Sequence, residues 1–351
     1  MGRSPRVIRG VSRSTLPGRV VPGVNAYAQE ETGKLWVGWN GLRSISERSS
    51  YFGGDNDVER VVGGGPRVLL ISASQPGCAT RYGDYVTMRA LKNKMDYANR
   101  HGMDVAFALE KHVSGGHRVD GLHNKISVIN RTIASRPDYD WYVWMDSDTI
   151  IADMDFEIPW SNYVDRSLVI WGTHTDFNKV VEESSYLSIN SGVVFFRNTP
   201  VIQSLFHSLK TIWAAGFDSA YLTLSRVVLG MPPYASDQST LMYLLATQPG
   251  KWRNEVQFVS YEYAINLYWR DPNVSSYTKT SWVGDGVTPP FVVHFCGCEL
   301  CWTENEHSPE CLAAFDKVYN FADDQVLAQA GLRHVNLSSP FVIDINRSTS
   351  L

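Results

Sequence analysis

The sequence predicts an α/β protein built on a doubly wound parallel sheet, and three observations carry this prediction. Apolar segments typical of strands alternate with amphipathic segments typical of helices between residues 67 and 145. The third apolar segment, Trp141–Met145, has five apolar residues in a row, as expected for a strand buried on both faces. It ends directly in Asp146 and Asp148, and ligands of open α/β sheets bind beyond the carboxyl ends of such strands.

The first half of the domain should contain three strands and two helices. Strands are expected at residues 67–72, 105–109 and 141–145, where aliphatic and aromatic residues are frequent. A helix over residues 84–100, stopped by Gly102, should bury one face made of Tyr85, Met88, Leu91, Met95 and Ala98. A second helix should end before Pro137 and bury the face made of Leu122, Ile126, Ile129 and Ile133.

The second half is less regular. Strands are expected at residues 168–172, 188–196 and 292–295. Three helices should begin at capping residues, namely at Thr199-Pro200, at Ser236 and at Ser308-Pro309. The simplest architecture is one compact domain over residues 63–328, with one half at 63–155 and the other at 156–328.

Two segments outside this domain are expected to lack regular structure. Residues 1–62 show little periodicity and precede a Gly-Gly-Gly-Pro breaker, so they are expected to form a flexible arm. Residues 329–351 are expected to form an irregular tail. The arm lacks the apolar core of a signal peptide, and no apolar run is long enough to span a membrane, so no anchor or signal peptide is visible in this chain.

Net charge and cysteine content indicate which kinds of partner and which kinds of cysteine site to expect. A formal net charge of −4 gives no basic field, so a nucleic-acid partner is not indicated. Of five cysteines, Cys78 stands alone and four form a cluster: Cys296, Cys298, Cys301 and Cys311. The cluster fits either structural zinc or one or two disulfides, and its spacing, which matches no common zinc finger or ribbon, favours disulfides.

The acidic pair after the third strand predicts a metal site. Two carboxylates at a strand end suit a hard divalent cation, and such a cation suits a diphosphate. Two unit charges about 4 Å apart repel by roughly 4 kcal/mol at an effective dielectric near 20, so Asp146 and Asp148 would repel a diphosphate without a cation between them. The alternative interpretation is a surface turn that happens to contain two aspartates.

Three further polar stretches lie at expected strand or helix ends. Asn190 opens an apolar strand, Asp237 and Gln238 lie at a helix start, and His294 ends a late strand. Each also has a purely structural interpretation: Asn190 could cap a strand, Asp237 could interact with the helix dipole, and His294 could be a hydrogen-bonded core residue.

Taken together, these pieces resemble the retaining glycosyltransferase family of plant xyloglucan α-1,6-xylosyltransferases and galactomannan α-1,6-galactosyltransferases, with fungal galactosyl- and mannosyltransferases as more distant members. The resemblance covers roughly residues 66–328, in one order. The matching residues are Ser74-Gln75-Pro76, Gly83-Asp84, Lys92 to Tyr97, His101-Gly102, Trp141 to Asp148, Asp153-Met154, Glu157 to Pro159, Asn190 to Gly192, Phe196 to Asn198, Asp237 to Ser239, His294-Phe295, Gly297-Cys298 and Asn320 to Asp323.

The resemblance implies a GT-A fold, in which residues 63–155 bind the nucleotide and residues 156–328 bind the acceptor. It implies that Asp146, Asp148 and His294 bind Mn²⁺. The UDP-sugar would contact five residues: Ser74 and Gln75 would face the base and ribose, and the other three are Asp146, Ser147 and Gly297. The groups around the anomeric carbon and the acceptor hydroxyl would be Asn190, Asp237 and Gln238.

The reaction implied is transfer of xylose or galactose, with retention, from a UDP-sugar to a polysaccharide or glycan acceptor. Members of the family act in the Golgi lumen, and a homo- or hetero-oligomer with related glycosyltransferases is a possible assembly. Plant relatives carry cysteines at similar places, so a disulfide pair is expected among Cys298, Cys301 and Cys311.

Two departures from the family pattern leave alternatives open. Ser236 stands where plant members have an acidic residue, and Glu299 stands where they have a lysine near the diphosphate. Lys125 or Arg197 could replace that lysine. The departures favour a competing interpretation, a catalytically weak or inactive relative that acts as the partner or scaffold of an active glycosyltransferase. A nucleotide-sugar hydrolase is less favoured, because no additional carboxylate cluster marks a water-activating site.

Overall fold

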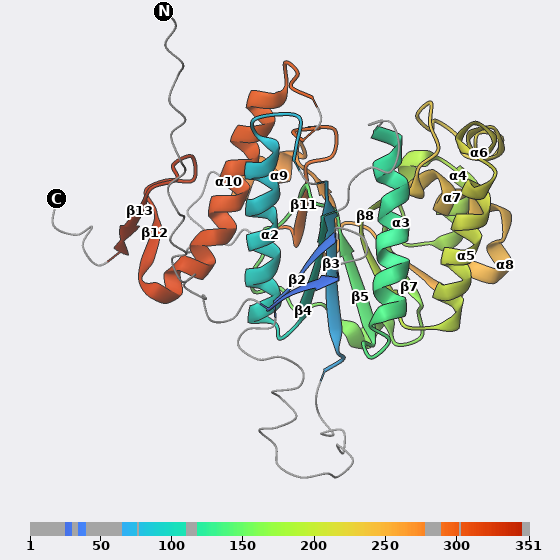
Figure 1. Cartoon of the computed structure of the whole chain (residues 1–351), viewed down its shortest axis with the longest axis horizontal. Helices are drawn as coiled ribbons and strands as arrows, with labels where there is room; N and C mark the ends of the chain where they lie inside the picture. The colour runs from blue at the N-terminus through green and yellow to red at the C-terminus, as the bar shows by residue number, and fades with distance from the viewer. Residues whose placement is uncertain are drawn as a thin grey trace, which may run out of the picture.

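The computed structural model describes seven stretches of the chain: residues 25–29, 34–39, 65–75, 77–109, 118–277, 289–301 and 303–345. They form one α/β domain with helices on both faces of an eight-stranded sheet (Figure 1). The strand order is β1-β2-β4-β3-β5-β8-β7-β9. The α/β class predicted from the sequence is therefore confirmed.

The first half contains the parallel core of the sheet. Strand β3 (Val68–Ser74) pairs in parallel with both β4 (Asp104–Leu109) and β5 (Trp141–Met145). Helices α2 (Gly83–Arg100) and α3 (Arg118–Ser135) lie on opposite faces of the sheet (Figure 1). The carboxyl ends of β3 and β5 therefore meet at a topological switch point, the usual place for a ligand in such sheets.

The second half makes the sheet mixed. Strand β8 (Ile189–Arg197) runs antiparallel to β5 and to β7 (Leu168–Gly172), and β9 (Val256–Val259) is parallel to β7. The helices of this half are α4 (Phe177–Glu183), α5 (Pro200–Ala214), α6 (Phe217–Leu224), α7 (Asp237–Thr247), α8 (Pro249–Trp252), α9 (Pro272–Tyr277) and α10 (Ser308–Leu327). Single 3₁₀ turns occur at η1 (Trp160–Tyr163), η2 (Tyr186–Ser188) and η3 (Ala328–Ala330).

The central strands are buried on both faces, as their uninterrupted apolar sequence predicts. Along β5, Trp141, Val143 and Met145 pack in one apolar cluster. Tyr142 and Trp144 pack in the other. Because successive side chains of a strand point to opposite faces, each cluster lies on one side of the sheet.

A smaller sheet brings a late segment of the chain to the end of β5. Its strand order is β10 (Leu267–Tyr268), β11 (Val292–His294) and β6 (Thr149–Ile151). Antiparallel pairing of β6 with β11 places Thr149 opposite His294. This pairing joins residues that are far apart in the sequence and defines where the aspartates meet the histidine.

The face that α2 buries differs from the predicted one. Tyr85 and Met88 are 40% and 62% exposed, whereas Asn93 and Lys94 are buried. The prediction was wrong for these residues because hydrophobic periodicity assigns polar side chains to solvent. Here Asn93 and Lys94 turn inward and hydrogen bond to the main chain of β6.

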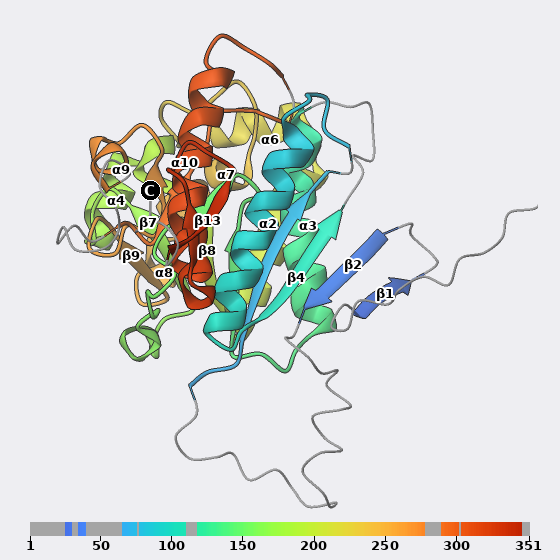
Figure 2. The same cartoon turned by 90° about the vertical axis from the view of Figure 1, so that its left-hand side faces the viewer.

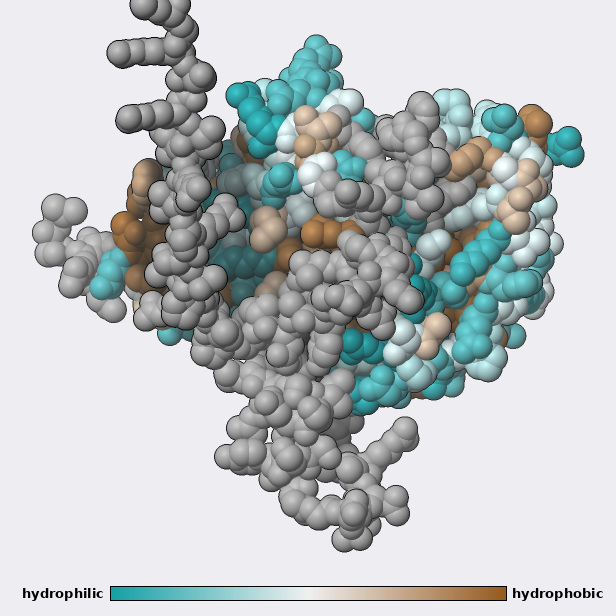
Figure 3. All heavy atoms as spheres, viewed as in Figure 1, coloured by the Kyte–Doolittle hydropathy of each residue, from teal (hydrophilic) through white to brown (hydrophobic). Residues whose placement is uncertain are grey.

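Both ends of the chain contain strands that the sequence did not predict. Within the expected arm, β1 (Asn25–Gln29) and β2 (Lys34–Trp39) extend the sheet beyond β4 (Figure 2). The rest of the expected arm lies outside the described residues. Within the expected irregular tail, β12 (Leu332–His334) pairs with β13 (Val342–Asp344), and apolar side chains of this hairpin are exposed (Figure 3).

Two disulfides are formed. Cys298 pairs with Cys311, which confirms the expected pair, and Cys78 pairs with Cys301, which was not predicted. Cys296 is free. Among the described helices, none combines the length and the apolar character needed to cross a membrane.

Candidate active site

All ten candidate residues chosen from the sequence line one pocket at the carboxyl ends of β3 and β5. The pocket has a volume of about 410 Å³. The ten are Ser74, Gln75, Asp146, Ser147, Asp148, Asn190, Asp237, Gln238, His294 and Gly297. The topology explains their convergence, because β8 and β11 run antiparallel to β5 and β6 and so bring Asn190 and His294 to the same edge.

Three of these residues form a candidate metal centre. Asp146, Asp148 and His294 each offer one ligand atom, and these atoms lie within 4.8 Å of one another. His294 Nε2 is 3.3 Å from Asp148 Oδ1 and 3.8 Å from Asp146 Oδ2. No other cluster of this kind occurs among the described residues.

The imidazole of His294 is held by a chain of two asparagines. His294 Nδ1 lies 2.9 Å from Asn266 Oδ1, and Asn266 Nδ2 donates to Asn190 Oδ1 at 2.6 Å. If Nδ1 carries the proton, the lone pair of Nε2 faces the two carboxylates, which is how metal-binding histidines are usually oriented. A side chain at Gly192 would collide with this imidazole, since its Cβ would lie 2.2 Å from His294 Cε1.

The charges at this centre shift one another's pKa values. Burial alone would lower the pKa of His294, but the Asp148 and Asp146 carboxylates raise it above its usual value. Burial opposes ionisation of Asp148, yet His294 lowers the pKa of that carboxyl. The pKa of Asp146 is raised by burial, although Lys125 opposes the shift. The Asp146 and Asp148 carboxylates together therefore attract positive charge. A proton on His294 can supply that charge, and so can a bound cation.

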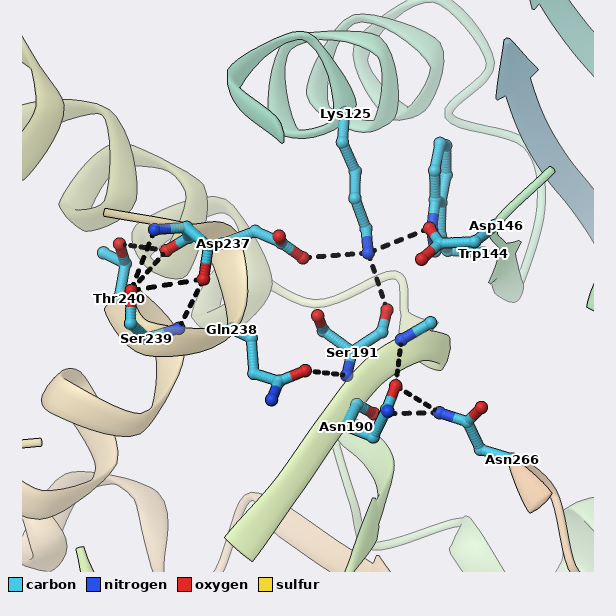
Figure 4. A network of polar contacts seen from close by, with 12 residues as sticks. Lys125, Trp144, Asp146, Asn190, Ser191, Asp237, Gln238, Ser239, Thr240 and Asn266 are labelled. Atoms are coloured by element: carbon cyan, nitrogen blue, oxygen red, sulfur yellow. Dashed lines mark hydrogen bonds and ion pairs between the residues drawn. The ribbon is translucent and has the colours of Figure 1, made fainter. Parts of the chain in front are cut away.

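Lys125 connects this centre to the other side of the pocket (Figure 4). Its Nζ lies 3.1 Å from Asp146 Oδ1 and 2.8 Å from Asp237 Oδ2, and it donates to the Ser191 carbonyl at 2.7 Å. Trp144 Nε1 also donates to Asp146 Oδ1, at 2.6 Å. A buried lysine thus fixes two carboxylates that arrive from different elements.

The three candidate catalytic residues have different surroundings. Asp237 is the first residue of α7, whose start is fixed by the predicted cap Ser236 in a reciprocal bond with Ser239. Gln238 accepts from the Ser191 N–H and donates to the Tyr186 carbonyl, at 3.2 and 2.8 Å. Asn190 Oδ1 accepts from Asn266 and from the N–H of Gly192. Gln238 and Asn190 therefore hold the pocket wall.

Of the remaining candidates, Gln75 and Gly297 lie on two loops that a disulfide joins. Ser74 is the last residue of β3, and Ser147 lies in the turn after β5. Gln75 Nε2 lies 3.0 Å from Cys301 Sγ, and the Cys78–Cys301 bridge links the loop after β3 to the loop after β11. Gly83 allows this approach, because a Cβ there would lie 2.1 Å from Cys78 Cβ. Gly297 has a φ of 81°, which favours glycine at this turn.

Sequence reasoning missed one functional candidate and misplaced another. Asn266, which holds His294, lies in a stretch without periodicity, so only proximity in the fold reveals it. Arg197 lies at the end of β8 and lines a different cavity, so it is not the replacement for the family lysine. Lys125 does line the pocket, but its charge is already matched by two carboxylates.

The profile of one protein family, the galactosyl transferase GMA12/MNN10 family, matches residues 64–305. The chain belongs to this family. The resemblance inferred from the sequence motifs is confirmed, and the single domain has the GT-A-type α/β fold that the resemblance implied.

Several curated plant proteins are similar to the chain. Probable glycosyltransferase 2 of Oryza sativa subsp. indica is 35% identical over 300 residues, which cover 83% of this chain and 61% of that protein. Xyloglucan 6-xylosyltransferase 4 of Arabidopsis thaliana is 31% identical over 315 residues, covering 87% and 60%. The chain thus spans about 60% of the length of these relatives.

Two solved glycosyltransferase structures align with lower similarity. One, a glycosyltransferase involved in the glycosylation of the major capsid of PBCV-1, has 14% identity and a TM-score of 0.45, and the match covers 71% of this chain and 99% of that one. The other, the galactosyltransferase LgtC in complex with donor and acceptor sugar analogs, has 12% identity and a TM-score of 0.38, covering 73% and 95%.

Proposed function

We propose that the chain is an Mn²⁺-dependent, retaining α-glycosyltransferase that moves xylose or galactose from a UDP-sugar to a polysaccharide or glycan acceptor. One observation carries the proposal: two carboxylates and an imidazole converge within 4.8 Å, in a pocket at the switch point of the sheet. Family membership and the similarity to a plant protein named as a xyloglucan xylosyltransferase support the choice of the two sugars.

The donor set supports Mn²⁺ as the ion. Carboxylate oxygens together with one imidazole nitrogen are suitable ligands for it. The 3.3 Å between His294 Nε2 and Asp148 Oδ1 is close to the ~3 Å between neighbouring ligands of an octahedral ion bound at about 2.1 Å. Asp146, Asp148 and His294 would hold the ion, which when bound would offset the charge that develops on the leaving diphosphate.

The side chains of the pocket would position the sugar and the acceptor. Asp237, which forms an ion pair with Lys125, would stabilise positive charge at the anomeric carbon. The acceptor hydroxyl oxygen bonds to the anomeric carbon, while the bond between the anomeric carbon and the diphosphate oxygen breaks. The hydroxyl proton passes to the departing β-phosphate. Asn190 and Gln238 keep the pocket wall in place for this transfer.

The other loop residues complete the proposed donor site. Ser74 and Gln75 would contact the base and ribose, while Ser147 and Gly297 would lie along the diphosphate. The two disulfides are consistent with an oxidising compartment such as the Golgi lumen, the location implied by the family resemblance.

The metal centre is tested by removing one ligand. Asp148→Ala is expected to abolish Mn²⁺-dependent UDP binding, measured by calorimetry, while circular dichroism shows an intact fold. Asp165→Ala makes the same change at an exposed position and should bind like the unaltered protein. Unchanged UDP affinity in folded Asp148→Ala would contradict the proposal.

The reaction is tested with a panel of nucleotide sugars, Mn²⁺ and glycan acceptors. Transfer from UDP-xylose or UDP-galactose, with an α-linkage in the product, is the expected result. Slow release of free sugar without transfer would instead indicate a hydrolase. UDP binding without any turnover would indicate a non-catalytic partner of another glycosyltransferase.

A further inference from the structure

The free edge of β6 is hydrogen bonded by side chains in place of another strand. One side of β6 pairs with β11, and β6 is the edge of its sheet. On the other side, Asn93 donates to the Ile151 carbonyl at 2.9 Å and accepts from the Ile151 N–H at 2.8 Å. Lys94 Nζ donates to the Thr149 carbonyl at 2.7 Å. Two neighbours on α2 thus satisfy main-chain groups that an additional strand would bond.

Helix α10 makes similar hydrogen bonds to the main chain just after β6. Gln325 of α10 donates to the Ala152 carbonyl at 2.8 Å and accepts from the Met154 N–H at 3.0 Å. Tyr97 on α2 and His101 directly after it lie within hydrogen-bond distance of main-chain carbonyls of the same segment. The Lys92-to-Tyr97 and His101-Gly102 stretches, which carried the family resemblance, therefore contact the segment that follows the metal ligands.

These side chains are buried although their types usually face solvent. Asn93 is 3% exposed, Lys94 is 0% exposed and Gln325 is 8% exposed. None of the three lines the pocket, so they are not placed to touch a donor or an acceptor. A buried polar group without a partner is destabilising, so each of these bonds favours one position of β6.

Strand β6 begins directly after Asp148 and lies between β11 on one side and the two helices on the other. We propose that Asn93, Lys94 and Gln325, the β6 clamp, are positioning residues for the metal ligands. Asn93 and Lys94 hydrogen bond to the free edge of β6, and Gln325 hydrogen bonds to Ala152 and Met154 directly after it. Together they hold the 146–149 turn against His294. This inference rests on the proposed metal-dependent function, and it assigns a role to residues that touch neither metal nor substrate.

The sharpest variant is Asn93→Leu, which keeps the number and branching of the side-chain non-hydrogen atoms and removes both bonds to Ile151. The same substitution at Asn99, exposed on the same helix, is the matched control. Asn93→Leu should weaken Mn²⁺ binding in the presence of UDP at least tenfold by calorimetry. Saturating Mn²⁺ should restore most of the turnover number, because the ligands themselves are intact, whereas Asp148→Ala should not recover.

Hydrogen exchange of the backbone amides provides a readout that needs no metal. The Ile151 N–H bonds to Asn93, whereas the Ala152 N–H bonds to Phe291 next to β11. Asn93→Leu should speed exchange at Ile151 at least tenfold and leave Ala152 protected. Gln325→Leu should do the same at Met154, with a smaller loss of Mn²⁺ affinity because it acts farther from the ligands.

The outcomes separate this inference from the proposed function. If the unaltered protein shows no Mn²⁺-dependent UDP binding, the function fails, and the positioning role fails with it. If the unaltered protein binds Mn²⁺ and UDP but both clamp variants bind them equally well, only the clamp is refuted. Should Asn93→Leu fail to fold, Gln325→Leu decides the question by the same two measurements.

Discussion

A buried lysine lies on each side of the 146–149 turn: Lys125 of α3 on the pocket side and Lys94 of α2 on the rear side. The two lysines have different surroundings. On the pocket side, burial alone would lower the pKa of Lys125, but the carboxylates of Asp146 and Asp237 raise it. On the rear side, burial lowers the pKa of Lys94 to about 7, although Asp148 and Asp146 oppose this shift. Lys94 contacts a main-chain carbonyl, whereas Lys125 contacts two carboxylates as well.

The difference shows that one lysine can balance the charge of the site while another holds the backbone in place. Lys125 keeps a permanent positive charge where two acidic side chains would otherwise repel each other. Lys94 hydrogen bonds to the backbone from behind, and because its pKa is about 7 it loses its positive charge as the pH rises above neutral. The front of the turn is therefore organised by ion pairs and its rear by hydrogen bonds to the main chain.

The largest expected effect comes from removing the front lysine. Lys125→Met leaves the buried Asp237 and the partly buried Asp146 without their cation. Breaking a buried ion pair in this way costs about 3–5 kcal/mol of folding stability. We expect kcat/KM to fall roughly 1000-fold, which corresponds to about 4 kcal/mol, in steady-state assays of sugar transfer. Unlike Asn93→Leu, this variant should not recover at saturating Mn²⁺. Recovery would mean that Lys125, too, only positions the turn.

Lys94, the rear lysine, should instead affect how the free energy of unfolding depends on pH. The pKa of Lys94 is lowered to about 7, so between that value and its unfolded value near 10.5 the unfolded chain binds more protons. The free energy of unfolding should then rise with pH, by about 2–3 kcal/mol between pH 7.5 and 9.5. Urea unfolding of Lys94→Met should lack this rise, and the exposed Lys92→Met should keep it. Equal slopes in all three proteins would refute the assignment.

The sequence predicted the front of the turn and not its rear, for a physical reason. Asp146, Asp148 and His294 end apolar strands, and strand ends converge at one edge of a sheet, so local patterns located them. Asn93 and Lys94 belong to a helix whose polar residues periodicity assigns to solvent. Their burial depends on unpaired main-chain groups of β6, a feature that appears only when the strands are assembled.

A smaller effect is expected from protonation of the histidine ligand. Mn²⁺ requires the neutral imidazole of His294, and Asp148 and Asp146 raise the pKa of that imidazole above its ordinary value of about 6.5. As the pH is lowered, Mn²⁺ affinity should therefore start to decrease before pH 6.5 is reached. Below that onset, the affinity should drop about tenfold per pH unit. Calorimetry with UDP between pH 5.5 and 8.5 measures this. A decline that starts well below pH 6.5 would show that the carboxylates do not act on His294.

The smallest expected effect concerns Glu299, which lines the same pocket as Lys125. The family resemblance implies a lysine at this position, and the backbone of Glu299 is left-handed, with a φ of 52°. A lysine would meet the same backbone strain as the glutamate, so Glu299→Lys changes mainly the charge. Because two carboxylates already match the charge of Lys125, an added cation should attract the donor diphosphate more than Lys125 does.

Exchanging a repulsion for an attraction about 6 Å from a phosphate, at an effective dielectric of roughly 40–80, shifts binding by about 1.5–3 kcal/mol. Solvent and salt reduce this at a half-exposed position, so we expect UDP to bind about fivefold more tightly to Glu299→Lys at low salt. Glu299→Gln, which only removes the negative charge, should give about half of the gain in free energy. Both gains should shrink as salt increases. A dissociation constant that is the same for all three proteins at every salt concentration would mean that Glu299 does not face the phosphates, and that the front of the pocket draws its positive charge from the metal and Lys125 alone.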